Sequence, residues 1–513
     1  MKIERKKNAI RNAFWGYLSK IISLVMPFIF RTIIIYSLGS DYVGLNSLFT
    51  SILQVLSLSE LGIGTAIVFN MYKPIARNDN KHISALLNLY KKLYFKIGIL
   101  ILTIGIFITP FLKYLINGSY PTEINIYIVY LAFLLNTVIG YILFGYKSSL
   151  INAYQRNDIE SKINAIINLL LYAVSSLLII LFKNYYLYLF VLVITTVLNN
   201  FILNYLTNKM YPNIKCIGEI ENDEKKEIRK NVIALVCHKV GATILNSADN
   251  IVISAFLGLT MLAQYTNYYY LMQAMSTLIL VCFTGLTGGI GNSFVTESKE
   301  KNSDYFSKIL FFNGYLAIMF GTILYSVFQD FICVWVGQNL MFDNLVVLLF
   351  VIYFFVHSIR RTIIVFRDGV GMWWENRFQP LISAVINLIL NIILVKYIGI
   401  YGILISTIIA MIVVDIPMEA KVFCKNKINL SEREYIFKLI GYFITLTIAC
   451  LCVYLINSII NIDIRMKIIV DGIVSLIISN LCIFIVYGRC KEYKYYFNTI
   501  IGLVRKCIIR KDK

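Results

Sequence analysis

Apolar residues occur in long runs along the chain, separated by short polar stretches. About fourteen of these runs approach the roughly 20 residues that a helix needs to cross the bilayer core. Helices satisfy all their backbone hydrogen bonds internally, so such runs predict an all-α, polytopic membrane protein with about fourteen spans. The predicted spans are 13–38, 43–72, 93–113, 124–147, 163–182, 184–206, 231–256, 261–287, 306–329, 344–366, 378–397, 401–420, 437–459 and 468–488.

Composition supports this interpretation. Hydrophobic residues make up 58% of the 513 residues and charged residues 15%, whereas soluble domains average roughly 45–50% and 25%. No polar stretch is long enough for a separate catalytic domain. We therefore expect lipid to cover most of the surface, and this excludes an ordinary soluble enzyme.

Lysine and arginine are unevenly distributed between alternate loops. The N-terminal stretch holds five and the C-terminal stretch eight, and further basic residues follow the second and sixth predicted spans. Cytosolic loops retain basic residues, so we predict a multi-pass protein of the cytoplasmic membrane with both termini in the cytosol. The net charge of +20 is then a topology signal, and no nucleic-acid partner is expected. The opposite loops carry only Lys113, Lys183, Lys396, Arg465 and Lys467.

The chain also resembles itself. Residues 163–171 (INAIINLLL) match residues 382–390 (ISAVINLIL) at six of nine positions, an offset of 219 residues from 382 minus 163. The same offset aligns Leu38-Gly39 with Leu257-Gly258, and Lys20 with Lys239. We interpret this as an internal duplication.

A duplicated unit with six helices has an even number of spans, so both copies have the same orientation. Such parallel repeats suggest two lobes that rock around a site near the middle of the membrane. The predicted domains are an N-terminal six-helix lobe (1–220), a C-terminal six-helix lobe (221–430), and two further helices with a basic tail (431–513). A monomer is expected.

Two predicted helices carry basic residues that lipid would not tolerate at depth. Lys20 and Arg31 are eleven residues apart and share one face of the first helix, at about 100° per residue. Lys239, Thr243, Asn246 and Asn250 lie on one face of the seventh helix, which is the repeat mate of the first. We expect both faces to line a cationic cavity for an anionic cargo such as a diphosphate. Alternatively, the lysines extend to the cytosolic interface.

Acidic residues within spans are further candidates. Glu60, in the second span, either pairs with Arg31 or exchanges a proton, and Asp249 is a candidate cavity residue of the seventh span.

Arg360 and Arg361 lie near the predicted cytosolic end of the tenth span. They either contact lipid headgroups or guard the inward mouth of the cavity. Asp415 precedes Pro417 and marks either a kinked, functional helix or an ordinary distortion at a helix end.

Several kinds of chemistry are not indicated. The sequence has no nucleotide-binding P-loop, so ATP hydrolysis is not expected. Cysteine and histidine spacings do not suggest a metal site, and no cofactor is predicted. Whether H⁺ or Na⁺ drives a transport cycle is left open.

The N-terminal residues resemble Wzx-type polysaccharide flippases. The similarity lies in residues 31–53 (RTIIIYSLGSDYVGLNSLFTSIL), 56–67 (LSLSELGIGTAI), 72–79 (YKPIARND) and 89–92 (LYKK). Residues 249–254 (DNIVIS) and 265–267 (YTN) are similar but weaker. Helix number and repeat layout extend the resemblance over the whole chain.

The resemblance implies membership of the superfamily of multidrug and toxin extruders, oligosaccharide flippases and lipid II flippases. It implies a transporter, not an enzyme, that moves undecaprenyl-diphosphate-linked oligosaccharide repeat units from the inner to the outer leaflet for capsule, exopolysaccharide or O-antigen synthesis. The implied partners are that lipid, the bilayer, and polysaccharide polymerase and assembly proteins. Two alternatives remain: a multidrug or cation antiporter of the same superfamily, and a membrane-embedded polysaccharide polymerase or ligase.

Overall fold

A computed structural model of the 513-residue chain describes most of its length. The described residues are 5–57, 63–221, 225–226, 240–241, 243–244, 247–284, 286–372, 374–460 and 462–499. Within them the regular structure is helical, and no β-strand is present. The predicted all-α, polytopic membrane architecture is thereby confirmed.

The chain divides into two compact units. One comprises Met1–Thr266 with Pro380–Lys396, and the other comprises Asn267–Gln379 with Tyr397–Lys513. We call them the first and the second unit and treat each by itself.

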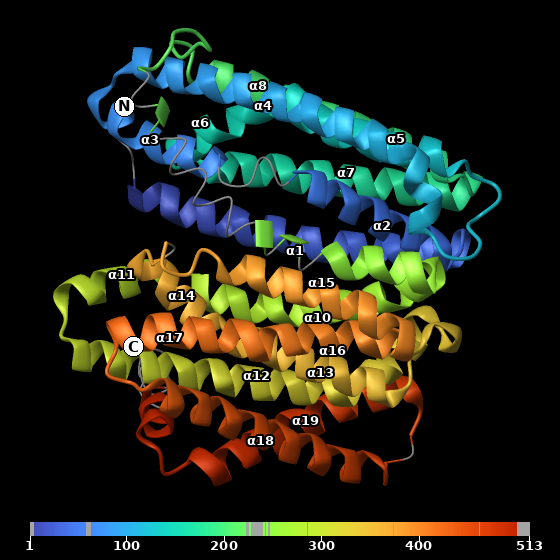
Figure 1. Ribbon diagram of the computed structural model, residues 1–513, viewed down its shortest axis with the longest axis vertical. Helices are drawn as coiled ribbons and strands as arrows, with labels where there is room; N and C mark the ends of the chain where they lie inside the picture. Colours follow the sequence, from blue (N-terminus) through green and yellow to red (C-terminus); the bar gives the residue numbers. More distant parts are fainter. Residues whose placement is uncertain are drawn as a thin grey trace, which may run out of the picture. The chain divides into compact units, whose positions relative to one another are not determined.

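The first unit contains the N-terminal helices shown in blue to green in Figure 1. Helices α4 and α5 pack together, α5 also contacts α8, and α1 packs along α7. A shorter apolar helix, Ser247–Leu257, belongs to the same unit. Its labelled helices are α1 (Arg5–Ser37), α2 (Ser40–Leu56), α3 (Ile63–Arg77), α4 (Asn80–Ile108), α5 (Ile126–Ile142), α6 (Ser148–Ala153), α7 (Asn157–Phe182) and α8 (Tyr185–Met210), with 3-10 turns η2 (Thr109–Leu115) and η3 (Gly145–Lys147).

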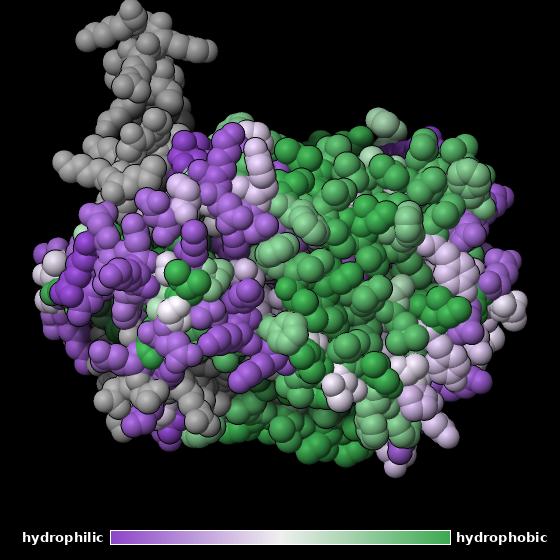
Figure 2. All heavy atoms as spheres, turned by 90° about the horizontal axis from the view of Figure 1, so that it is seen from above, coloured by the Kyte–Doolittle hydropathy of each residue, from purple (hydrophilic) through white to green (hydrophobic). Residues whose placement is uncertain are grey.

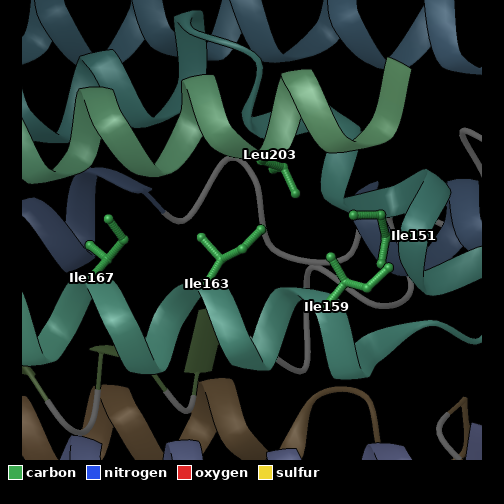
Figure 3. Packing of buried hydrophobic residues seen from close by; sticks show 5 residues of the cluster. All are labelled: Ile151, Ile159, Ile163, Ile167 and Leu203. Atoms are coloured by element: carbon green, nitrogen blue, oxygen red, sulfur yellow. The ribbon is translucent and has the colours of Figure 1, made fainter. Parts of the chain in front are cut away.

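Branched aliphatic side chains hold α6, α7 and α8 together. Ile159, Ile163 and Ile167 recur every four residues along α7, so they lie on one face of that helix. This face meets Ile151 of α6 and Leu203 of α8 (Figure 3). The conspicuous repeat sequence 163–171 thus includes part of the packing surface of α7.

The second unit is built around α12 (Lys299–Val336), whose 38 residues extend about 57 Å at ~1.5 Å per residue. This exceeds the ~30 Å bilayer core, so α12 projects beyond it. It packs against α13, α18 and α19. The other helices are α11 (Thr287–Thr296), η4 (Gln338–Leu340), α13 (Asn344–Ile359), α14 (Arg361–Val370), α16 (Ile400–Ala410), the π-helical turn η5 (Met411–Asp415), α17 (Ile416–Lys427), α18 (Glu432–Asn457) and α19 (Ile464–Tyr487); α10 (Leu259–Thr284) and α15 (Gln379–Ile398) contribute to both units.

Ten described helices are long and apolar enough to cross a membrane, and eleven if α5 with η3 and α6 counts as one span bent by 47°. Figure 2 looks onto the side of the molecule where α4, α5 and α8 lie, and shows a broad apolar band with hydrophilic side chains gathered at its two ends. Exposed apolar residues of these helices include Phe107 of α4 and Phe190 and Phe201 of α8. A surface with apolar residues between polar ends fits a bilayer and its two interfaces.

The predicted spans correspond to these helices with local differences. Span 43–72 is described as two helices, α2 and α3, on either side of residues 58–62. Span 124–147 breaks after Ile142, because the backbone leaves helical geometry at Leu143 and Phe144 adopts a positive φ of 55°. Most of span 231–256 lies outside the described residues; its described end forms the helix Ser247–Leu257.

Helix boundaries recur at the offset of 219 residues. Helix α2 begins at Ser40 and α10 at Leu259, while α4 begins at Asn80 and α12 at Lys299. The residues before the second pair, Asp79 and Ser298, cap their helices by accepting backbone N–H bonds from His82 and Lys301 at 3.0 and 3.4 Å. These equal offsets support the duplication, which stays a proposal. Positive φ values recur in the same register at Gly39 and Gly258, and at Gly118 and Gly337.

Candidate functional site

The first unit contains a polar cavity of about 590 Å³ between membrane helices. This volume lies within the roughly 300–1,000 Å³ of typical ligand sites. Four of its residues come from α2, one from the residue that caps its C-terminus (Ser57), and the rest from α5, α7, α8 and the segment before Ser247. The lining residues are Asn46, Thr50, Leu53, Gln54, Ser57, Phe133, Asn136, Thr137, Tyr172, Tyr188, Leu192 and Thr243.

Helix α2 presents a continuous polar stripe to this cavity. Asn46, Thr50 and Gln54 follow one another every four residues, so they lie on one face of the helix. Thr50 donates to the side-chain oxygen Oδ1 of Asn46 at 3.3 Å, and the Asn46 side-chain amide donates to the Tyr188 hydroxyl at 3.3 Å. The second bond ties the polar stripe of α2 to α8.

The lining combines amides, hydroxyls and aromatic rings, and no lysine, arginine or carboxylate occurs among its described residues. Asn136 of α5 contributes an amide oxygen that is buried and has no hydrogen-bond partner in the described structure. An unsatisfied buried acceptor is costly, roughly 1–3 kcal/mol. The wall of the cavity therefore contains one hydrogen-bond acceptor that the described residues leave unsatisfied.

Arg31 lies close to this wall on α1 and is half-buried. Its guanidinium donates to the hydroxyl of Thr266 on α10. Ser47, the neighbour of Asn46 on α2, donates to the same hydroxyl oxygen at 3.5 Å. Arg31 is thus linked to α2 through two residues, Thr266 and Ser47, the second of which adjoins the polar stripe. Lys20 is exposed on α1 and does not line the cavity.

Asn250 and Asp249 occupy different surroundings in the first unit. The Asn250 amide donates to the Ser51 hydroxyl of α2 at 2.9 Å. Asp249 is buried, and its two carboxylate oxygens accept bonds from the Asn391 amide at 2.6 Å and the Tyr265 hydroxyl at 3.3 Å. Asp249 is therefore a buried carboxylate within a polar cluster, and it is not among the cavity residues.

Three sequence candidates, Glu60, Lys239 and Asn246, lie outside the described residues. Thr243, which lies on the same predicted face of the seventh span as Lys239, lines the cavity. Whether Lys239 adds a positive charge there remains a prediction.

Arg360 in the second unit has internal partners. Its guanidinium contacts Asp415 at 2.7 Å and Glu419 at 2.7 Å, and all three side chains are buried. Gln379 donates to the same Asp415 carboxylate. This ion-paired cluster ties α13 to the π-helical turn η5 and α17, a geometry unlike that of an arginine held free for lipid headgroups. The neighbouring Arg361 is half-buried at the start of α14.

The sequence reasoning missed the polar cavity residues of α2 and α5 and the partner Glu419. The signal at α2 was available, because three polar residues recur at helical spacing within an apolar run. Glu419 follows Asp415 by one helical turn. By contrast, Asn136 and Tyr188 have no local signal, since only packing brings α5 and α8 to the stripe.

Solved membrane proteins share this fold at low sequence identity. The lipid II flippase MurJ, in an inward closed conformation, has a TM-score of 0.68 and 13% identity over 93% of this chain and 99% of its own. An inward-facing multidrug resistance MATE family transporter of the MOP superfamily has a TM-score of 0.58 and 12% identity over 82% of this chain and 96% of its own. A MOP superfamily transporter from Pyrococcus furiosus has a TM-score of 0.52 and 12% identity over 86% and 96%.

No curated protein matches the sequence of this chain. Residues 9–287 match a family described as polysaccharide biosynthesis protein, and this range covers more than half of the chain. The match spans α1 to α10 and therefore includes the polar cavity and Arg31. This helical membrane protein, with the fold of the lipid II flippase and the multidrug transporters, belongs to the polysaccharide biosynthesis protein family.

Proposed function

We propose that the protein is a flippase that moves undecaprenyl-diphosphate-linked oligosaccharide repeat units from the inner to the outer leaflet. The observation that carries the proposal is the neutral polar cavity inside a membrane unit of a polysaccharide biosynthesis protein. Amides and hydroxyls are costly to place in the hydrocarbon core, so a 590 Å³ cavity lined by them needs a polar occupant. A sugar that crosses the membrane is such an occupant.

The lining favours saccharide chemistry. Sugar hydroxyls donate and accept hydrogen bonds, which suits the amides of Asn46, Gln54 and Asn136, and the rings of Tyr172 and Tyr188 offer apolar faces. The diphosphate needs a cation instead, and Arg31 is linked through Thr266 to Ser47, the chain neighbour of Asn46. We therefore propose that the sugar enters the cavity while Arg31, with Lys239, holds the diphosphate.

The transport cycle would be alternating access between two parallel lobes, 1–220 and 221–430. Equal helix starts and N-caps at an offset of 219 support this division. The loop charges support cytosolic termini in the cytoplasmic membrane. Polymerase and assembly proteins that use the exported repeat unit would be its functional partners.

The cavity does not favour the alternatives. A cation antiporter would place a carboxylate in its cavity, and none occurs among the described lining residues. A polymerase or ligase needs catalytic groups that act on a sugar phosphate, and the lining consists of neutral side chains.

Removal of the gene tests the proposal directly. Lipid-linked repeat units should accumulate on the inner leaflet, and the surface polymer should decrease. Purified protein in liposomes should expose the same lipid-linked sugar to an external glycosidase. If the lipid-linked sugar fails to accumulate in cells that lack the protein, the proposal is wrong.

A variant that fills the cavity supplies a sharper test. Asn136→Leu removes the orphan acceptor and adds apolar bulk. We expect it to reduce flipping strongly while the protein stays folded in the membrane. Leu135→Met, on the exposed neighbouring position of α5, is the matched control and should flip normally.

A further inference from the structure

Helices α18 and α19 lie outside the duplication, and their contact with α12 buries a carboxylate that the proposed function does not use. Asp471 of α19 is 1% exposed, and neither of its carboxylate oxygens has a hydrogen-bond partner within the described structure. Ser475, one turn further on the same face, is fully buried and its hydroxyl is also without a partner there. Burying such groups unsatisfied is expensive.

The facing helices bring more oxygen atoms to the same place. Ser326 of α12 donates to the backbone carbonyl of Asp471 at 3.5 Å. Asn457, at the end of α18, donates its amide N–H to the Ser326 hydroxyl at 2.8 Å. Its own carbonyl oxygen is buried and has no partner in the described residues. Three helices thus meet at a point rich in unsatisfied oxygen.

Charge at this point does not balance. Lys467 lies one turn before Asp471 and contacts Asp330 of α12 at 3.1 Å. Asp330 itself lies one turn after Ser326. One lysine therefore faces two carboxylates, and because it pairs with Asp330, the negative charge of the buried Asp471 is left uncompensated.

We propose that this cluster, the α19 carboxylate site, binds one monovalent alkali cation, Na⁺. The available ligands are oxygen atoms from Asp471, Ser475 and Asn457, and hard cations prefer oxygen ligands. One positive charge balances the cluster. A single proton on Asp471 would also balance it, but would satisfy only one of the oxygen acceptors. The site joins the last two helices to α12, so it does not depend on the proposed transport function.

The test uses the purified full-length protein and Na⁺ itself. Thermal unfolding is measured in NaCl and in choline chloride at equal ionic strength and constant pH. We expect a saturable rise of Tm with Na⁺ in the wild type and a much smaller rise in Asp471→Asn. Asp463→Asn, which removes a carboxylate at the exposed start of α19, should keep the full response.

Two more variants make the outcome decisive. Ser475→Ala keeps the charge but removes one ligand, so the Na⁺ midpoint should rise several-fold. Lys467→Met removes the competing cation, so the midpoint should fall. A Tm that responds to pH but not to Na⁺ in the wild type would overturn the proposal in favour of a protonated Asp471. An Na⁺ response that Asp471→Asn retains in full would place the cation elsewhere and overturn it as well.

Discussion

The hydroxyl of Thr260 donates a 2.6 Å hydrogen bond to the carboxylate of Asp41, and these residues are 219 positions apart. Ser47 and Thr266 are in contact at the same offset. In a pair of repeats related by a two-fold axis, a residue touches its own equivalent only near that axis. The two contacts join the N-terminal halves of α2 and α10, and they support the proposed parallel duplication.

A reversible cross-link at this position should stop transport. The side-chain oxygens of Ser47 and Thr266 are 3.5 Å apart, so Ser47→Cys with Thr266→Cys can form a disulfide after a small adjustment. Because alternating access requires the two repeats to move apart at one end, we expect the oxidised variant to lose flipping and the reduced variant to regain it. Flipping in liposomes before and after reduction measures this.

Each single cysteine variant serves as a control, because Thr266→Cys alone removes the hydroxyl that accepts from Arg31 and Ser47→Cys alone keeps it. The native cysteines make mapping of the disulfide by mass spectrometry necessary. Undiminished flipping in the fully cross-linked protein would show that α2 and α10 stay together through the cycle.

Arg31 is expected to contribute binding energy to an anionic headgroup. A hydrogen bond to a charged group contributes about 1.5–3 kcal/mol, so Arg31→Ala should reduce flipping by about 10- to 100-fold. Arg31→Lys keeps a point charge, so its flipping rate should lie between those of Arg31→Ala and the wild type. Initial flipping rates at equal amounts of membrane-inserted protein provide the measurement.

Thr266→Val separates positioning from charge, because it removes the partner of Arg31 and keeps the guanidinium. We expect a loss smaller than that of Arg31→Ala. Equal flipping by Arg31→Ala and wild type would remove Arg31 from the site.

The sequence was informative about elements whose signal is local. Apolar length predicted the spans, and the match between residues 163–171 and 382–390 predicted a duplication whose register recurs at the starts of α2 and α10. Charge inside a span marked Arg360 as a candidate gate or headgroup residue, and that role stays a prediction. The sequence did not show that Arg360 is neutralised by Asp415 and Glu419, because those partners lie more than fifty residues away.

The candidate cavity was harder to predict for the same reason. Basic residues dominated the expectation, whereas the described cavity is lined by neutral amides, hydroxyls and rings. In the sequence, Asn46 and Gln54 look like any other polar residues, and only the packing of α5 and α8 beside α2 makes them cavity residues. Their role depends on packing between helices that one sequence does not specify.

The ion-paired cluster around Arg360 should be costly to break from one side. Arg360→Met leaves Asp415 and Glu419 buried without a counter-charge, and such a loss costs about 3–5 kcal/mol. We therefore expect a large decrease in thermal stability. The triple variant Arg360→Met, Asp415→Asn, Glu419→Gln removes all three charges and should recover much of it.

An exposed ion pair provides the comparison. Lys301 contacts Glu297 at 2.8 Å with side chains 72% and 43% exposed, so Lys301→Met should change stability by less than about 1 kcal/mol. If the triple variant is as unstable as Arg360→Met alone, the loss comes from packing and not from uncompensated charge.

Two glycines in equivalent positions of the repeat should respond differently to alanine. Gly39 and Gly258 both have positive φ, 111° and 89°, so alanine is strained at either position by roughly 1–2 kcal/mol. At Gly258 an added Cβ would also lie 2.8 Å from the backbone oxygen of Asn117, whereas at Gly39 nothing lies within 4 Å. Asn117 is fixed there, because its backbone and side-chain N–H groups bond the carbonyl oxygens of Ser254 and Phe256 at 2.9 and 2.6 Å. We therefore expect Gly258→Ala to lower Tm more than Gly39→Ala.

Gly289→Ala, in an open helical position of α11, is the control. It should leave Tm unchanged or raise it slightly, since alanine favours helix by roughly 0.5–1 kcal/mol. Equal losses at Gly39 and Gly258 would mean that the segment holding Asn117 moves away without cost, and that its two bonds to the Ser247–Leu257 helix add little to stability.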